Sequence, residues 1–208
     1  MFGFGEMIIK GGVLMIPIIF CSVLSFAVII ERTFSLHRAQ VDSETFFRKI
    51  EEPVRRNKIV EALNLCEETK GSVPRIVKSG LLCQDRPMEE VREAIEETAS
   101  FEIPYLERYL GILATIATVA PLLGLLGTVA GLMRAFMVVQ MKSGLVGPAD
   151  LAGGIWEALI TTVAGLSVAI PTYIAYNYFV NRVNNIITEM EKSASRLLQL
   201  LSLREPVA

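Results

Sequence analysis

The segment Ala120–Ala135, APLLGLLGTVAGLMRA, decides the fold, because small residues recur in and just before it at heptad spacing. Alternating steps of four and three residues place them on one face of a helix. That face consists of Ala117, Pro121, Gly124, Thr128, Gly131 and Ala135. Residues 110–133 carry no charge, which predicts a helix inside a membrane, where small residues allow another helix to approach closely.

A later apolar segment carries a second stripe of the same kind. It consists of Gly154, Ala158, Thr162, Gly165, Ala169 and Thr172. Threonine hydroxyls on either stripe would find no water if the stripe faced lipid. We therefore interpret the two stripes together as the lining of an assembly, with space at its centre.

The composition indicates a membrane protein that keeps a substantial soluble part. Apolar residues make up 52% of the chain and charged residues 20%, and the formal net charge of -2 argues against a nucleic-acid partner. The charges leave three windows almost empty, at 11–30, 110–133 and 158–180. Because about 20 apolar residues cross a bilayer as a helix, the sequence predicts an all-α membrane protein with three transmembrane helices.

The cations give the expected orientation. Lys10, Arg134 and Lys142 fall on one side of the three helices, and the other 17 of the 20 Lys and Arg (20 minus 3) fall on the opposite side. Since cations concentrate on the cytoplasmic side, the N-terminus is expected outside and the C-terminus in the cytoplasm. The predicted segments are a short outer N-terminus (1–10), transmembrane helix 1 (11–30), a cytoplasmic helical domain (31–109), transmembrane helix 2 (110–133), an outer loop with helix ends (134–154), transmembrane helix 3 (155–180) and a cytoplasmic helical tail (181–208).

The cytoplasmic parts have the patterns of long helical extensions. The Glu-rich segment from Met88 follows Pro87, and we expect it to continue into transmembrane helix 2 as one long helix, with Pro104 as an irregularity. The third helix is expected to continue past the membrane with a coiled-coil seam. The seam consists of Val183, Ile187, Met190, Ala194, Leu197 and Leu201. Its partner is either the middle segment or another copy of the chain.

Two threonines are the candidates for chemistry on the stripes. Thr128 and Thr162 are expected at the same depth, in the outer half of the bilayer, with Thr161 beside them. A hydroxyl donates and accepts hydrogen bonds, so it can orient water or bond an ionisable group. The alternative is that these hydroxyls bond to a helix backbone and only pack, which is common in membrane helices.

Glu157 is the one carboxylate in or near the last two apolar windows. It either marks a pathway or an ion pair, or it lies among lipid headgroups near the start of its helix. No Asp, Glu, His, Lys or Arg occupies residues 110–133 or 158–180. If the chain guides protons, the titrating group must come from a partner with its own intramembrane carboxylate.

PLLGLLGTVAGL at 121–132 and EALITTVAGLSVAIPTYIAYN at 157–177 resemble the paired signatures of the MotA/TolQ/ExbB proton-channel family. The GG-x-x-M-x-P start at 11–17 and IIER at 29–32 resemble the same family. The resemblance implies a bacterial inner-membrane protein with a periplasmic N-terminus and a cytoplasmic C-terminus. It also implies a homopentameric ring around single transmembrane helices of an ExbD- or TolR-type partner, each with an Asp. By motif, Thr128 and Thr162 match the family's pore threonines, and Glu157 matches the Glu of its EAL motif.

This resemblance predicts an ExbB-like subunit of a motor driven by the proton-motive force, acting on a TonB-like or TolA-like protein. The alternatives are a TolQ-like subunit for envelope integrity and division, and a scaffold that conducts no protons. The candidate pathway is Thr128, Thr161, Thr162 and Glu157, and the candidate small-residue packing positions are Ala117, Pro121, Gly124, Gly131, Ala158, Gly165 and Ala169. With three cysteines in no CxxC spacing, a lone His37 and no phosphate loop, we predict no metal, no cofactor and no enzyme.

Overall fold

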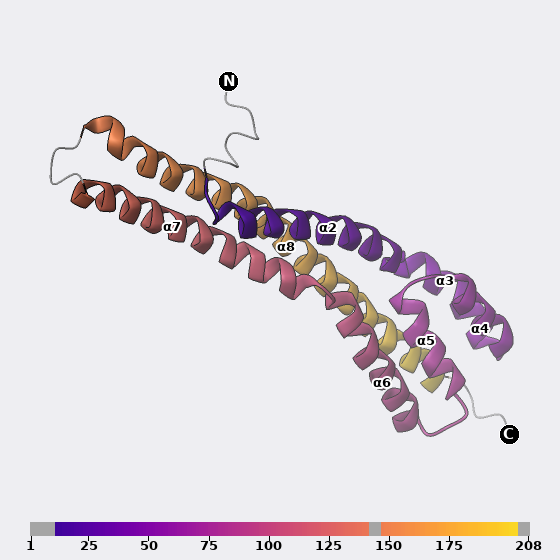
Figure 1. The fold of residues 1–208 in the computed structure, drawn as a ribbon. Helices are drawn as coiled ribbons and strands as arrows, with labels where there is room; N and C mark the ends of the chain where they lie inside the picture. The colour runs from indigo at the N-terminus through magenta and orange to yellow at the C-terminus, as the bar shows by residue number, and fades with distance from the viewer. Residues whose placement is uncertain (1–10, 142–146, 204–208) are drawn as a thin grey trace. The chain divides into compact units, whose positions relative to one another are not determined.

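The structure is a computed structural model, and it describes residues 11–141 and 147–203, apart from the side chains of Ala149 and Asp150. The described chain is built from helices joined by short turns (Figure 1). In chain order the helices are α2 (Met15–Ala39), α3 (Ser43–Arg55), α4 (Ile59–Glu68), α5 (Ser72–Leu82), α6 (Met88–Glu107), α7 (Leu110–Met141) and α8 (Pro148–Ser202).

Three helical segments of the described chain are long and apolar enough to cross a membrane, and they contain α2, α7 and α8. The prediction of an all-helical protein with three long apolar helices is therefore confirmed. The third continues well beyond its apolar part, because α8 has 55 residues and includes Pro171 without a break.

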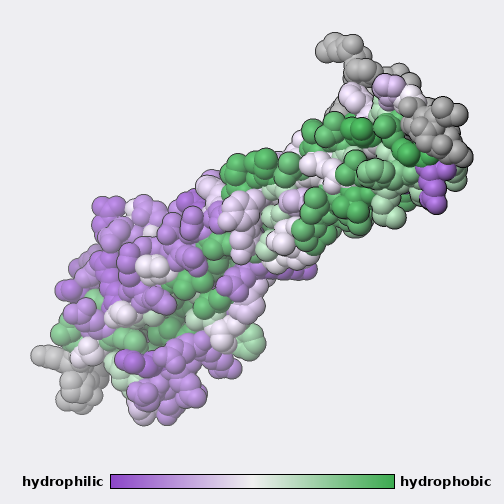
Figure 2. Space-filling view, turned by 90° about the vertical axis from the view of Figure 1, so that its left-hand side faces the viewer, coloured by the Kyte–Doolittle hydropathy of each residue, from purple (hydrophilic) through white to green (hydrophobic). Residues whose placement is uncertain are grey.

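The chain divides into two compact units. Unit 1 contains Met1–Glu31 and Tyr109–Tyr178, and unit 2 contains Arg32–Arg108 and Phe179–Ala208. In the view of Figure 2 the surface of unit 1 is mainly hydrophobic, whereas that of unit 2 is mainly hydrophilic.

In unit 1, α2 packs against both α7 and α8. Met15 and Ile18 of α2 form a buried cluster with Ile160 of α8, and Leu123 of α7 packs against it. A second cluster, nearer the start of α7, consists of Ile116, Ala120 and Ala169, with Cys21 and Leu24 of α2 beside it. The three apolar helices thus share small cores within unit 1, while large apolar side chains such as Phe20, Leu125 and Ile170 stay exposed on its outside.

In unit 2, α3 to α6 and the last part of α8 bury large apolar side chains around one another. Asp42 caps α3 by accepting hydrogen bonds from the backbone and hydroxyl of Thr45. The core contains Phe46, Phe47, Ile50, Val54, Ile76, Val77, Leu81, Val91, Ile95, Leu106, Val183, Ile186, Met190, Leu197, Leu200 and Leu201. The seam predicted on α8 therefore packs against the middle segment of the same chain, which was the first of the two partners considered.

The expectation of one continuous helix through Pro104 into α7 is wrong. Pro104 lies inside α6, and the helix ends three residues later. Arg108 has ψ 136° and Tyr109 has φ +66°, so neither is helical. The buried Arg32 guanidinium donates to the carbonyls of Tyr105 and Leu106, at 3.4 and 3.2 Å. A cation that bonds the last carbonyls of a helix stabilises its end, which explains the break.

Candidate functional site

The two predicted stripes of small residues meet each other along α7 and α8. A Cβ atom added to Gly131 would lie 2.6 Å from the carbonyl oxygen of Gly154, and one added to Gly165 would lie 2.5 Å from that of Ala120. As the residue number rises on α7 it falls on α8, so the two helices are antiparallel. The backbones approach so closely that only glycine fits at these crossing points.

Gly127 and Thr161 form the tightest part of this contact. A Cβ atom on Gly127 would lie 2.1 Å from the Thr161 hydroxyl oxygen, and Thr161 is 1% exposed. Gly127 lies beside the predicted stripe and was not part of it. The contact face of α7 is thus rotated slightly from the predicted face, and it contains Gly124, Gly127, Gly131 and Ala135.

This arrangement gives the stripes a partner within one chain. Gly124, Gly131, Ala158, Gly165 and Ala169 are buried, whereas Ala117 and Pro121 are partly exposed. The predicted close approach of another helix is present. Within the chain, however, each stripe faces the other striped helix and does not face a central space. That these faces also border the pore of an assembly stays a prediction.

Every candidate threonine donates its hydroxyl to a backbone carbonyl. Thr128 bonds Leu125 at 2.6 Å within α7, and Thr161 bonds both Glu157 and Ala158 within α8. Thr162 bonds across the helices, to the carbonyl of Gly124 at 3.1 Å. The backbone-bonded alternative therefore describes these hydroxyls in the isolated chain.

Thr128 and Thr162 retain partial exposure, unlike Thr161. Thr128 lies one helical turn beyond Gly124, to which Thr162 is bonded. A hydroxyl that has donated its proton still accepts hydrogen bonds with its oxygen. Since both residues are partly exposed, we expect their oxygens to accept hydrogen bonds from water or from a protonated group.

Glu157 forms an ion pair with Arg134 of α7. One guanidinium nitrogen, Nη1, lies 2.5 Å from Oε1 and 2.6 Å from Oε2 of the carboxylate. The ion pair that the first interpretation of Glu157 included is therefore present, and a position of Glu157 among lipid headgroups stays a prediction. Sequence reasoning used Arg134 only for orientation and missed it as this partner.

Gly12 completes the surroundings of the pair. Its φ is +68°, in the region that favours glycine, and it precedes the first turn of α2. A Cβ atom on Gly12 would lie 2.0 Å from Oε1 of Glu157 and 3.5 Å from Nη1 of Arg134. In the Gly11–Gly12 pair, Gly12 therefore occupies a position where both the backbone conformation and the neighbouring side chains favour glycine.

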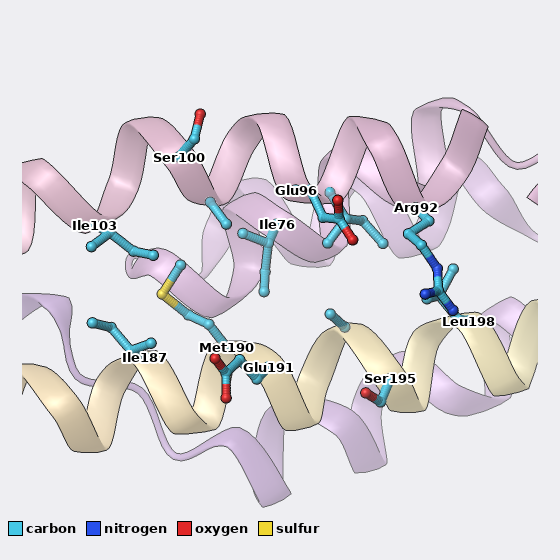
Figure 3. Close-up of a pocket in the computed structure, with 13 residues that line it drawn as sticks. Ile76, Arg92, Glu96, Ser100, Ile103, Ile187, Met190, Glu191, Ser195 and Leu198 are labelled. Atoms are coloured by element: carbon cyan, nitrogen blue, oxygen red, sulfur yellow. The ribbon is translucent and has the colours of Figure 1, made fainter. Parts of the chain in front are cut away.

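Unit 2 contains a separate groove of about 480 Å³ between α6 and α8 (Figure 3). Ile76 of α5 lies between the two helices, and Arg92, Glu96 and Glu191 contribute its charged side chains. Ile187 and Ala194 of the predicted seam line this groove, whereas their neighbours in the seam are buried. None of the candidate pathway residues lies in it.

No group of three or more His, Cys, Asp or Glu side chains within residues 11–141 and 147–203 is arranged to hold a metal ion. In unit 2, burial raises the pKa of the Cys66 thiol to about 12, with a smaller lowering by Lys78. A thiol with such a pKa is protonated at neutral pH, whereas the reactive form of cysteine is the thiolate.

Fold and site together define a helical membrane protein whose second and third apolar helices pair through glycines and threonines. Residues 68–192 match the model of the MotA/TolQ/ExbB proton channel family, and the chain belongs to that family. It is 35% identical to the putative biopolymer transport protein ExbB-like 3 of Synechocystis sp. over 170 residues, which cover 81% of each chain.

Two further relatives represent two named branches. The Tol-Pal system protein TolQ of Haemophilus influenzae is 34% identical over 180 residues, covering 79% of this chain and 77% of its own. The biopolymer transport protein ExbB of Neisseria meningitidis serogroup B is 31% identical over 179 residues, covering 81% and 80%. The identities to the two branches are too similar to separate them.

Proposed function

We propose that this chain is a subunit of an inner-membrane motor that uses the proton-motive force. In this proposal a homopentameric ring of the chain surrounds helices of an ExbD/TolR-type partner and moves a TonB-like or TolA-like load. The N-terminus then lies in the periplasm and unit 2 in the cytoplasm. The names of the relatives support an ExbB-like role in biopolymer transport first, and a TolQ-like role second.

One observation carries the proposal. In a family of proton channels, this chain has two paired helices with two partly exposed threonines and no Asp, Glu, His, Lys or Arg between 110 and 133 or between 158 and 180. A hydroxyl can pass a hydrogen bond along but cannot hold a proton in transit. The titrating group is therefore assigned to the partner, as an intramembrane carboxylate. A proton that crosses about 100 mV releases about 2.3 kcal/mol, which is the energy that each proton would supply to the motor.

The second candidate is a scaffold that holds a partner without coupling to any gradient. It is favoured by the bonding of the threonines, since every hydroxyl already has a backbone acceptor. The two candidates assign different roles to the threonine hydroxyls. In the motor they serve the proton path, whereas in a scaffold they contribute only to helix packing.

The test replaces Thr128 and Thr162 together by Val, which keeps the shape and removes both hydroxyls. The chain is co-expressed with the product of its neighbouring gene, and the purified complex is reconstituted into liposomes under a proton gradient. We expect the complex to assemble, because an interhelical hydrogen bond in a membrane contributes only about 0.6 kcal/mol. Proton uptake is expected to fall to the level of empty liposomes.

Thr118→Val is the matched control. Thr118 is exposed, lies on neither stripe and donates to Ala114 in its own helix, so this variant also loses a hydroxyl, but away from the proposed path. Its complex should take up protons like the unmodified one. Normal uptake by the Thr128/Thr162 double variant would rule out the motor and leave the scaffold.

A further inference from the structure

The carboxylate of Glu157 is fully engaged within the chain. Both of its oxygens lie within 2.6 Å of the same nitrogen of Arg134, and its side chain is only 18% exposed. The Arg134 side chain is 52% exposed, so it extends from the surface of α7 to the Glu157 carboxylate. Among the described residues of α7 and of α8 up to Tyr178, Arg134 and Glu157 are the charged side chains that form an ion pair within unit 1.

Three separate elements meet at this carboxylate. Arg134 comes from α7, Glu157 from α8 and Gly12 from the turn before α2. The absence of a side chain at Gly12 leaves the space that Oε1 occupies, since a Cβ atom there would lie 2.0 Å from it. The ends of all three apolar helices are thereby joined at one charged contact.

The contact also continues toward the threonines. The backbone carbonyl of Glu157 accepts a hydrogen bond from Thr161, whose hydroxyl oxygen in turn contacts the face of Gly127. One residue further, Thr162 bonds Gly124 across the helices. A movement of the α8 backbone at Glu157 would therefore displace the contacts of Thr161 and Thr162, which lie about one turn further along the helix.

A carboxylate held in this way is poorly suited to pass protons. Protonating it would break its ion pair with Arg134 and leave the guanidinium, whose side chain is 52% exposed, without its counterion. We propose that Glu157 acts as one half of an ionic clamp that fixes the outer ends of α7 and α8, and that Arg134 is the positioning residue of this clamp. The proton pathway then uses the threonine oxygens and the partner, and not the Glu157 carboxylate.

The clamp and a proton relay predict opposite results for a double replacement. If Glu157 relays protons, its loss abolishes transport whether or not Arg134 is present. If it clamps, each single replacement leaves one unpaired charge, and replacing both restores a neutral pair that can still form hydrogen bonds. The informative variants are Glu157→Gln, Arg134→Gln and the combination of the two.

Two measurements on these variants test the proposal. The first is thermal unfolding of the purified chain in detergent, which does not depend on the proposed function. Each single variant should unfold several degrees below the unmodified chain, at about 2–4 °C for each kcal/mol lost, and the double variant should unfold above both singles. Additive shifts would overturn the clamp.

The second measurement is proton uptake by the complex in liposomes, which rests on the proposed function. Uptake should be lowered in both singles and higher in the double variant than in Glu157→Gln. Arg134→Lys should retain most of the uptake, because a single nitrogen makes both contacts. Uptake that is lost in every variant without Glu157, including the double, would establish a relay and overturn the clamp.

Gly12→Ala supplies a third variant that changes no charge. It should lower the unfolding temperature at least as much as Arg134→Gln, because the added carbon displaces the carboxylate and an alanine is strained at a φ of +68°. In the Glu157→Gln/Arg134→Gln background, the part of this effect that comes from the displaced carboxylate should be lost. A matched Gly153→Ala variant, where a Cβ atom meets nothing within 4 Å, should not. If the unmodified complex takes up no protons, the proposed function fails, while the unfolding results still decide the clamp.

Discussion

Unit 1 and unit 2 hold their helices together with different kinds of side chain. In unit 1 the close contacts of α7 with α8 come from glycine, alanine and threonine, and many of the large apolar side chains are exposed. In unit 2 the large side chains, such as Phe47 and Leu197, point inward. The hydrophobic effect drives burial in water, but lipid is as apolar as leucine and gives no such gain. Helices in a membrane therefore associate where their backbones can touch.

The largest expected effect is a truncation in unit 2. Phe47 is 1% exposed, packs edge-on against Phe46 and lies under the guanidinium of Arg196. Phe47→Ala should lower the free energy of unfolding of unit 2 by about 3–5 kcal/mol, because it creates a cavity. Hydrogen exchange of unit 2 amides in the detergent-solubilised chain measures this. Phe101→Ala, at a residue that is 71% exposed, should change it by about 0.5 kcal/mol or less; equal effects would contradict the described core.

An enlargement in unit 1 should follow. Gly131→Leu places a side chain where the Gly154 carbonyl is 2.6 Å from the position of Cβ, so it should destabilise unit 1 by about 1–3 kcal/mol. Gly153→Leu is the control, since nothing lies within 4 Å of its Cβ position. Both replace a helical glycine by the same residue, so helix propensity cancels. Thermal unfolding in detergent should separate them; similar melting temperatures would mean that α7 and α8 do not touch there.

The smallest effect concerns the thiol in the core of unit 2. Burial raises the pKa of Cys66 to about 12, above the ordinary value of 9.0. Because the thiol pKa is higher in the folded state, the protonated thiol contributes to the free energy of unfolding fully below pH 9. This contribution is lost as the pH rises toward 12. In a Cys21→Ala/Cys83→Ser variant, labelling of Cys66 by N-ethylmaleimide at pH 8 should therefore be slow until the protein unfolds. Rapid labelling of the folded variant would show that unit 2 is open around α4.

The sequence predicted the apolar helices well, because charge-free windows and heptad spacing depend only on local order. The stripes on α7 and α8 were also recognised, although Gly127 was missed since it lies one step off the predicted face. The error about α6 and α7 has a different origin. The break at Arg108 and Tyr109 depends on Arg32, which is 76 residues from Arg108 by number (108 minus 32) and bonds the end of α6. No local pattern carries that information.

The partner of Glu157 was within reach of the sequence. Pairing the two stripes with each other in antiparallel order brings Gly131 opposite Ala158 and Ala135 opposite Gly154. Arg134 and Glu157 are the immediate neighbours of Ala135 and Ala158, so this register places them within one helical turn of each other. The stripes were instead interpreted as facing a central space, and the ion pair went unnoticed.

The measurement that tests the proposed motor most directly is the native mass of the complex, purified with and without the product of the neighbouring gene. The proposal predicts a five-fold ring of this chain that captures a small protein with one transmembrane helix and an intramembrane Asp. A ring that captures no such protein, or a chain that forms no ring, would contradict the motor and leave α7 and α8 as the paired helices of a scaffold.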